Sequence, residues 1–247
     1  MSEHEKLRAV PNERVLCFDV ETTGLSSYDE ILQLSIIDGA GRVLFNEYIK
    51  PCNHTAWEQA ESINGISPSM VADKPTLEAY RDSLNAIFAN AELIVGYNSI
   101  SFDNGFLERA GIVIPETALQ YDVMIEFAPI YGDWNEKYGD YKWQKLSTCA
   151  SYYGYHGEGS FHDSLEDVRA TLHCFRCMIQ DEEERKVPHR EEEYCQCGEL
   201  SKGVYTQGDA NGFGYWEFCL KCGKKIEDGF HYYNHYDGAD HDDIDIY

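Results

Sequence analysis

Residues 14–24 read RVLCFDVETTG, and this stretch decides the fold. The apolar run predicts a buried strand over residues 14–20 that ends in a Thr-Thr-Gly turn. Because strand side chains alternate between faces, we expect Asp19 and Glu21 on one face and Phe18 and Val20 on the other, toward the core. Two adjacent carboxylates repel each other unless a cation lies between them, and oxygen ligands favour Mg²⁺ or Mn²⁺. Taken alone, this pattern is more often two exposed acids at the end of a strand.

The segments that follow predict the rest of the fold. Residues 30–38 and 42–49 read as strands joined by a Gly-Ala-Gly turn, so the chain opens as an antiparallel meander. Helices and strands then alternate, which is typical of an α/β protein with a mixed sheet flanked by helices. We expect helices over 56–63, 76–90, 102–110, 145–153 and 163–179, and strands over 92–97 and 119–123.

A second acidic position follows the buried strand predicted over 92–97. The sequence there is Asn-Ser-Ile-Ser-Phe-Asp, residues 98–103, and it opens a predicted helix. Asn98 lies at the end of the strand, where α/β proteins place ligands. Asp103 falls in the first helical turn, where the helix dipole favours an anion. The alternative is a helix-start aspartate with no further role.

The third acidic stretch is His162-Asp163-Ser-Leu-Glu166-Asp167. Asp163 and Glu166 have the spacing of a capping box, with Asp163 as the N-cap. His162 and Asp167 then occupy the two positions whose side chains meet at a helix start. An imidazole is therefore expected beside a third potential metal ligand at the mouth of this helix. The alternative is that the pair only caps the helix.

Taken in order, the segments FDVETTG, NSISFDNGFL and HDSLEDVRAT resemble the three motifs of the DEDDh (DnaQ-like) 3′→5′ exonucleases. The chain is similar to the proofreading epsilon subunits of bacterial DNA polymerase III within that family. The resemblance covers about residues 12–180, including the Ile-Asn-Gly-Ile-Ser stretch at 63–67. It implies a ribonuclease H-like mixed sheet, in agreement with the meander.

The resemblance also assigns roles to the acids. It implies that Asp19, Glu21, Asp103 and Asp167 hold two Mg²⁺ or Mn²⁺ ions, and that His162 is the general base. Two such ions stabilise an in-line attack on a phosphodiester.

Four further positions match those at which the family contacts the terminal nucleotide: Thr22, Leu25, Ile66 and Asn98. Asn64 departs from the pattern, because many members have histidine there. Substrate preference therefore stays open.

The C-terminal region holds two cysteine pairs, each followed by glycine. Cys195 and Cys197 form the first pair, and Cys219 and Cys222 form the second. With strand-like stretches between them, four thiolates in this layout resemble a zinc ribbon holding one structural Zn²⁺. So small a segment has little core, so that metal would supply much of its folding energy.

We therefore expect four parts along the chain: an exonuclease domain, a charged linker, a zinc-ribbon-like module and an acidic His/Tyr tail. Their predicted bounds are 1–180, 181–193, 194–230 and 231–247.

Composition limits where and on what the protein acts. The N-terminus is polar, and no stretch approaches the roughly 20 apolar residues of a membrane helix, so we expect a cytoplasmic protein without a membrane partner. Nine cysteines, an odd number, indicate reduced thiols more than a disulfide framework. The net charge of −24 disfavours tight nonspecific binding to duplex nucleic acid.

The expected function is release of nucleoside monophosphates from DNA 3′ ends, in proofreading or end trimming. One alternative is a 3′→5′ exoribonuclease of the same family. An alternative of another class is a non-catalytic acidic module that binds a partner or mimics nucleic acid. The sequence leaves open DNA against RNA, single strand against duplex end, and whether a polymerase or other replication partner docks through the C-terminal module.

Overall fold

The computed structural model describes residues 3–135, 139–157 and 163–180, and the backbone of three further strands between 202 and 232. The chain divides into two compact units. Of the described residues, 3–132 and those between 141 and 180 belong to the larger unit, whereas 133–135, 139–140 and the three strands between 202 and 232 belong to the smaller one.

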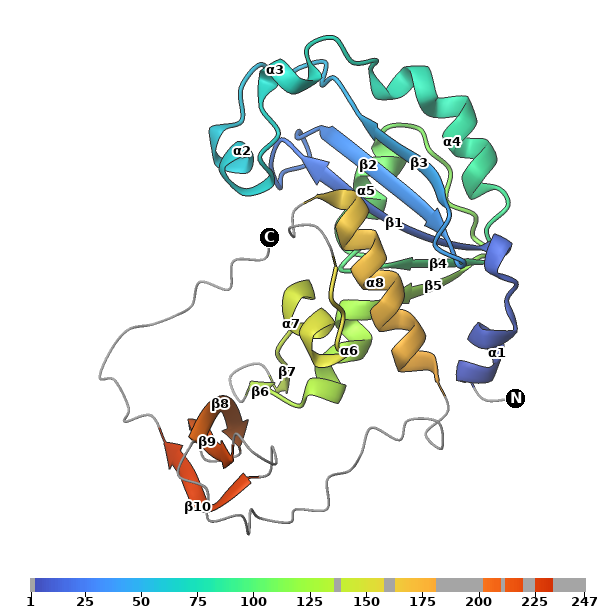
Figure 1. Ribbon diagram of the computed structural model, residues 1–247. Helices are drawn as coiled ribbons and strands as arrows, with labels where there is room; N and C mark the ends of the chain where they lie inside the picture. Colours follow the sequence, from blue (N-terminus) through green and yellow to red (C-terminus); the bar gives the residue numbers. More distant parts are fainter. Residues whose placement is uncertain are drawn as a thin grey trace. The chain divides into compact units, whose positions relative to one another are not determined.

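A five-stranded mixed sheet is the centre of the larger unit (Figure 1). Its strands lie in the order β3-β2-β1-β4-β5. The first three strands are antiparallel, and β4 and β5 continue the sheet parallel to β1. The strands are β1 (Val15–Thr22), β2 (Ile31–Asp38), β3 (Val43–Tyr48), β4 (Leu93–Gly96) and β5 (Leu119–Asp122). The predicted meander and mixed sheet are confirmed.

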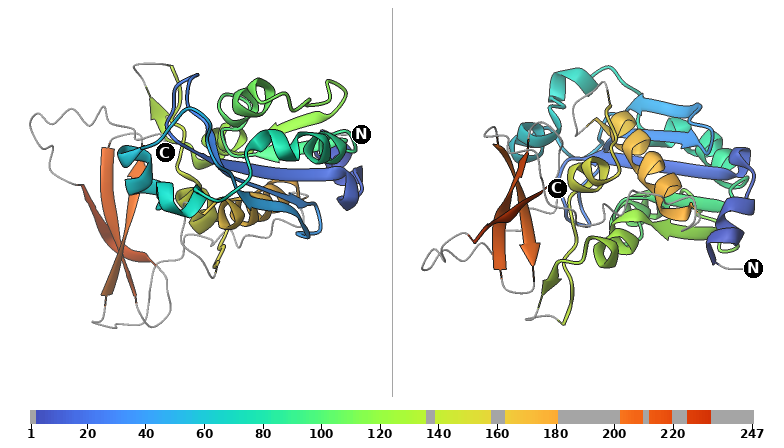
Figure 2. Two further views of the ribbon diagram at one scale, coloured as in Figure 1. Left: turned by 90° about the horizontal axis from the view of Figure 1, so that it is seen from above. Right: turned by 60° about the horizontal axis from the view of Figure 1, so that its bottom comes forward.

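Helices cover both faces of this sheet. Helices α4 (Arg81–Phe88) and α5 (Asp103–Arg109) pack on one face, and α6 (Val123–Tyr131), α7 (Leu146–Tyr152) and α8 (Ser164–Ile179) pack on the other. The left view of Figure 2 shows α4 and α8 on opposite sides of the sheet.

Strand β1 contributes to both layers of the core, as its alternation predicts. Leu16, Phe18 and Val20 belong to the cluster under α4 and α5, whereas Val15 and Cys17 belong to the cluster under α8. The odd-numbered face of β1 therefore lies under α8, and this face carries Asp19 and Glu21.

The remaining elements are short. They are α1 (Glu3–Ala9), η1 (Asn12–Arg14), α2 (Glu58–Asn64), α3 (Pro68–Val71), η2 (Leu77–Tyr80), β6 (Trp134–Asn135) and β7 (Asp140–Tyr141).

One expectation about a helix was wrong. The helix predicted over 76–90 is split, because a 3₁₀ turn at 77–80 precedes α4. Helices α1, α3 and α6 were not predicted; Pro129 lies inside α6, and proline usually ends a helix. The Asp122 side chain caps α6 by accepting from the Met124 N–H at 3.1 Å.

The smaller unit contains a three-stranded antiparallel sheet in the order β10-β9-β8. Its strands are β8 (Lys202–Asp209), β9 (Gly212–Cys219) and β10 (Lys225–Tyr232), of which β10 was not predicted. Cys219 is the last residue of β9. Cys195, Cys197, Cys222, the linker and the end of the tail lie outside the described residues, so the zinc module stays a prediction.

Among the residues that the structure describes, no helix is long and apolar enough to cross a membrane.

Candidate active site

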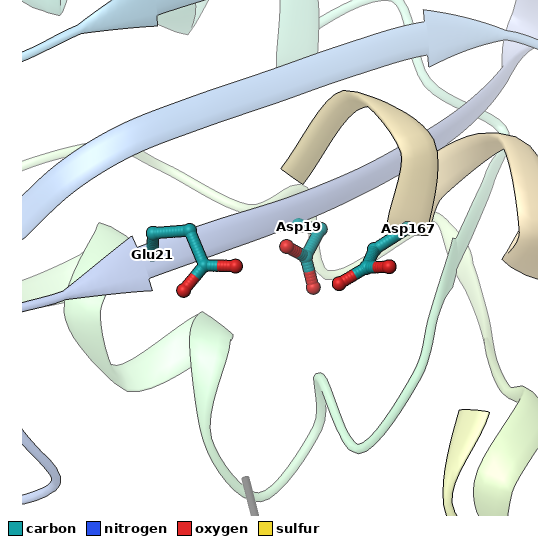
Figure 3. A group of neighbouring side chains, drawn as sticks. All are labelled: Asp19, Glu21 and Asp167. Carbon is teal, nitrogen blue, oxygen red and sulfur yellow. The ribbon is translucent and has the colours of Figure 1, made fainter. Parts of the chain in front are cut away.

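Three carboxylates meet where β1 passes beneath the start of α8. Asp19 and Glu21 project from β1, Asp167 projects from the first turns of α8, and the three side chains point into the same space (Figure 3). One oxygen from each residue lies within 4.8 Å of the others. The sequence predicted the shared face of Asp19 and Glu21, and the fold brings Asp167 to it from almost 150 residues further along the chain.

Hydrogen bonds place the start of α8 over β1. Ser35 is paired with Asp19 in the register of β1 and β2, so its side chain lies on the same face of the sheet. Its hydroxyl lies 2.6 Å from the hydroxyl of Ser164, the first residue of α8, and both side chains are buried. The Cys17 thiol contacts the Val168 carbonyl at 3.5 Å, one turn further along α8.

The N-terminus of α8 has the predicted cap. The Asp163 carboxylate accepts from the backbone N–H groups of Leu165 at 3.1 Å and Glu166 at 3.3 Å. The other half of the predicted capping box is replaced, because the Glu166 carboxylate contacts Arg169 at 2.6 Å and the Tyr155 hydroxyl at 3.4 Å. His162, the predicted general base, lies outside the described residues.

Asp103, the fourth predicted acid, begins α5 and is only 3% exposed. Its Oδ1 accepts from the backbone N–H of Val20 at 3.2 Å. It is not part of the three-oxygen cluster, but after burial its charge does most to raise the pKa of Asp19. Asp103 therefore lies beside the cluster as a buried neighbour.

Burial and mutual repulsion disfavour the charged form of these acids. Burial first, then the charges of Asp103, Asp167 and Glu21, hold the pKa of Asp19 well above its usual range. Burial and then Asp167 raise the pKa of Glu21 to about 8, against a hydrogen bond from the Asn64 side chain. Burial also raises the pKa of Asp103 to about 7. A bound cation would lower these pKa values again, because it favours the carboxylate form.

The donor set fits a hard divalent cation. Mg²⁺ holds oxygen ligands at about 2.0–2.1 Å, so opposite ligands lie roughly 4.2 Å apart. Carboxylate oxygens within 4.8 Å of one another need only small side-chain movements to reach that geometry. No sulfur or nitrogen ligand belongs to this cluster in the described part of the chain.

The four residues predicted to contact a nucleotide differ in accessibility. Leu25 is 51% exposed, in the turn after β1. Thr22 is 7% exposed, and its hydroxyl donates to the Gly24 carbonyl at 2.8 Å. Ile66 is 2% exposed, in a cluster with Leu32 and Trp57, so its side chain offers almost no surface to a ligand. This burial does not favour the contact predicted for Ile66.

Asn98, the fourth, has a backbone conformation that L residues rarely adopt. Its φ is 61°, and it is the only non-glycine residue with positive φ in the described chain. Asp122 holds this conformation by accepting from the N–H groups of Asn98 at 2.9 Å and Ile100 at 3.2 Å. The Asn98 Oδ1 is buried and has no hydrogen-bond partner among the described residues.

Asp122 was not predicted from the sequence, where its only signal is an aspartate at the end of a predicted strand before an apolar run. Asn64 was noted only as a departure from the family pattern. Its Nδ2 donates to the Thr22 carbonyl at 3.2 Å, and its Oδ1 accepts from the Ile66 N–H at 3.0 Å. Asn64 therefore ties the loop after α2 to the end of β1.

Comparison with known proteins gives a consistent result. The family described as "Exonuclease" matches residues 16–175. The chain is 30% identical over 163 residues to the uncharacterized exonuclease CP81 of Escherichia phage 186, which covers 62% of this chain and 82% of the phage protein. It is 26% identical over 193 residues to the PolC-type DNA polymerase III of Bacillus subtilis strain 168, covering 75% of this chain and only 13% of the polymerase.

A solved structure shares the fold. The zinc-ion-bound form of E. coli ExoI in complex with single-stranded DNA superposes with a TM-score of 0.52 and 21% sequence identity. The match covers 69% of this chain and 41% of ExoI. The fold of this chain therefore has a counterpart among solved proteins.

Proposed function

This chain belongs to the exonuclease family, and from that premise we propose that it is a metal-dependent 3′→5′ exonuclease of the DEDDh type acting on DNA 3′ ends. The observation that carries the proposal is the convergence of Asp19, Glu21 and Asp167 from two distant segments, with Asp103 buried beside them. Partly buried acids that raise one another's pKa, as Asp19 and Glu21 do with their neighbours, are typical of functional sites.

We assign the four acids to two neighbouring ion positions. Asp19, in the centre, would hold both ions, Glu21 and Asp167 the first, and Asp103 the second. Two Mg²⁺ or Mn²⁺ ions, when bound, supply stabilisation of the charge that grows on the attacking and leaving oxygens of the phosphodiester.

His162 is proposed as the general base that takes a proton from the attacking water. It directly precedes Asp163, the cap of the helix that carries Asp167. A free imidazole titrates near pH 6.5, so its neutral, proton-accepting form is available at neutral and mildly alkaline pH.

The terminal nucleotide is proposed to lie against Leu25, Thr22 and Asn98. Leu25 has the exposed apolar surface that can stack against a base of any sequence. The buried, unpartnered Oδ1 of Asn98 is an acceptor suited to a nucleotide hydroxyl. Ile66, which is buried with Leu32 and Trp57, is proposed to stabilise the 63–67 segment instead of touching the nucleotide.

DNA is the favoured substrate because the ExoI structure holds single-stranded DNA and because PolC is named as a DNA polymerase. The PolC match also supports a polymerase or replication partner, with proofreading or end trimming as the role. Residues 194–230 are proposed to form a module with one structural Zn²⁺. This module and the acidic tail are proposed to bind that partner.

The test uses the full chain with Mg²⁺ or Mn²⁺ and single-stranded and duplex oligonucleotides of DNA and RNA labelled at either end. We expect release of labelled mononucleotide from 3′-labelled DNA, and a ladder shortening from the 3′ end with 5′ label. Asp19→Ala should be nearly inactive. Degradation of RNA alone would favour the exoribonuclease, and no degradation of any substrate would favour a non-catalytic acidic module.

A further inference from the structure

The last residue of β1 and the turn that joins it to β2, together called the 22–30 turn, are held by a polar network separate from the metal-site acids. This turn carries Thr22 and Leu25, both proposed above to contact the terminal nucleotide. Leu25 is half exposed and belongs to none of the core clusters of the described chain. Its position therefore depends on the backbone of the turn.

Asp29 stabilises the turn through hydrogen bonds to its other residues. Its carboxylate accepts from the Ser26 N–H at 2.8 Å, the Ser26 hydroxyl at 2.7 Å and the Thr23 hydroxyl at 2.8 Å. A Cβ on Gly24 would lie 2.8 Å from the same carboxylate, so a side chain at this position would have to displace Asp29. The residues on both sides of Leu25 are thus hydrogen-bonded to the Asp29 carboxylate.

Glu30 links the turn to the segment after β3. Its carboxylate accepts from the backbone N–H groups of Cys52 at 2.7 Å, Asn53 at 2.8 Å and His54 at 3.1 Å. The same carboxylate lies 2.8 Å from His54 Nδ1. Hydrogen bonds to a carboxylate of this kind are among the stronger ones in proteins.

His54 contacts both carboxylates at once. While its Nδ1 faces Glu30, its Nε2 lies 3.5 Å from Asp29 Oδ1. The ring therefore connects the group that closes the turn to the group that anchors it. None of these three residues belongs to the cluster of Asp19, Glu21 and Asp167.

We propose that His54 is a positioning residue for substrate recognition: by bridging Asp29 and Glu30 it fixes the 22–30 turn so that Leu25 lies against the base of the terminal nucleotide. The proposal rests on the proposed exonuclease function. Without the His54 imidazole, Asp29 and Glu30 are no longer bridged. The turn then becomes more mobile, and Leu25 samples positions away from the base. The metal-site acids, which are held by β1, α5 and α8, keep their places.

The test compares two single-stranded DNA oligonucleotides that differ only in whether the 3′-terminal nucleotide carries a base. The measured quantity is the ratio of kcat/KM for the base-bearing end to kcat/KM for the abasic end. For wild type we expect a ratio of about ten or more, the usual size for one apolar contact. His54→Ala should lower this ratio severalfold, through KM for the base-bearing end, with kcat changed less.

Leu25→Ala provides the matched comparison. It should lower the ratio as His54→Ala does, and the double variant should lose no more than either single variant, since both act through one contact. His54→Asn keeps a donor toward Glu30 and should lose less. Lys50→Ala, which changes an exposed side chain in the neighbouring segment, should leave the ratio unchanged.

The outcomes separate the two proposals. If wild type degrades DNA but His54→Ala and His54→Asn both keep the wild-type ratio, the positioning role is overturned and the exonuclease stands. Equal losses at both ends point to general destabilisation and also overturn it. If wild type degrades no oligonucleotide, the exonuclease proposal fails, and the positioning role fails with it.

Discussion

The backbone N–H of Val20 donates to the carboxylate of Asp103 at 3.2 Å. Pairing of β1 with β4 extends only to Cys17 and Val95, so beyond that point a side chain from α5 takes the place of a neighbouring strand. One carboxylate therefore both completes the edge of β1 and adds negative charge next to Asp19.

These two roles of Asp103 separate in a pair of variants. Asp103→Asn keeps an oxygen acceptor for Val20 but removes the charge, so nuclease activity should fall roughly 10–100-fold. The metal-free protein should be at least as stable as wild type at pH 8, because the charge that burial disfavours is gone. Asp103→Ala removes the acceptor as well and should cost a further 1–3 kcal/mol or so of unfolding free energy. Degradation rates and denaturant unfolding in a chelator check both. Wild-type activity of Asp103→Asn would remove this residue from the metal site.

The stability of the metal-free protein should decrease as the pH rises from about 5 to 8. Glu21 and Asp103 have folded-state pKa values of about 8 and about 7, above their ordinary values of 4.5 and 3.8. Groups with raised pKa contribute stability below the unfolded pKa and lose it as the pH passes through the folded one. Mg²⁺ or Mn²⁺ binds only the folded site, so it should raise Tm more at pH 8 than at pH 5.5.

Thermal unfolding with and without metal across this pH range measures the effect. Glu21→Gln is the matched control, because it removes one of the titrating groups and should flatten the pH dependence. A metal-free Tm that rises between pH 6 and pH 8 would contradict the buried, mutually repelling acids.

His162→Ala should lower kcat by roughly 10²–10⁴, the usual effect of losing a general base. The wild-type rate should rise toward mildly alkaline pH as the imidazole becomes neutral, and the variant should lose this rise. His156→Ala alters an exposed histidine six residues earlier and should behave as wild type. Steady-state rates between pH 6 and pH 9 test this, and an unchanged profile in His162→Ala would assign the base elsewhere.

The cap of α8 should matter for activity as well as for stability. Asp163→Ala leaves the N–H groups of Leu165 and Glu166 without their acceptor, at a cost of about 1 kcal/mol of unfolding free energy. Activity should fall too, because the first turns of this helix hold Asp167. Asp163→Asn retains a capping oxygen and should keep most of the unfolding free energy and most of the nuclease activity. Equal behaviour of Asp163→Ala and wild type in unfolding and nuclease assays would contradict the coupling.

The full chain should contain one Zn²⁺ per molecule when purified without chelator. Cys219→Ser together with Cys222→Ser should abolish this zinc, as elemental analysis would measure. Cys52→Ser changes an exposed free cysteine of the larger unit and is expected to keep the metal. A wild-type chain with no bound zinc would contradict the ribbon-like module.

Several features followed from local sequence. The apolar alternation in 14–24 predicts β1 and the shared face of Asp19 and Glu21, and Asp163 is identified as a helix cap from its spacing to Glu166. Other features did not, because each depends on a partner distant in sequence. Asn64 reaches Thr22, Asp122 holds Asn98, and Ile66 is buried by Trp57 and Leu32, which no local pattern reveals.

By itself the sequence determined which residues are apolar, which alternate and which can cap, because these properties act within a few residues along the chain. Only the tertiary structure decided that α8 crosses β1 where Asp167 meets Asp19 and Glu21, and that His54 lies between Asp29 and Glu30. The physical reason is that electrostatic repulsion, burial and hydrogen bonding depend on distance in space. Packing of the two faces of the sheet sets those distances.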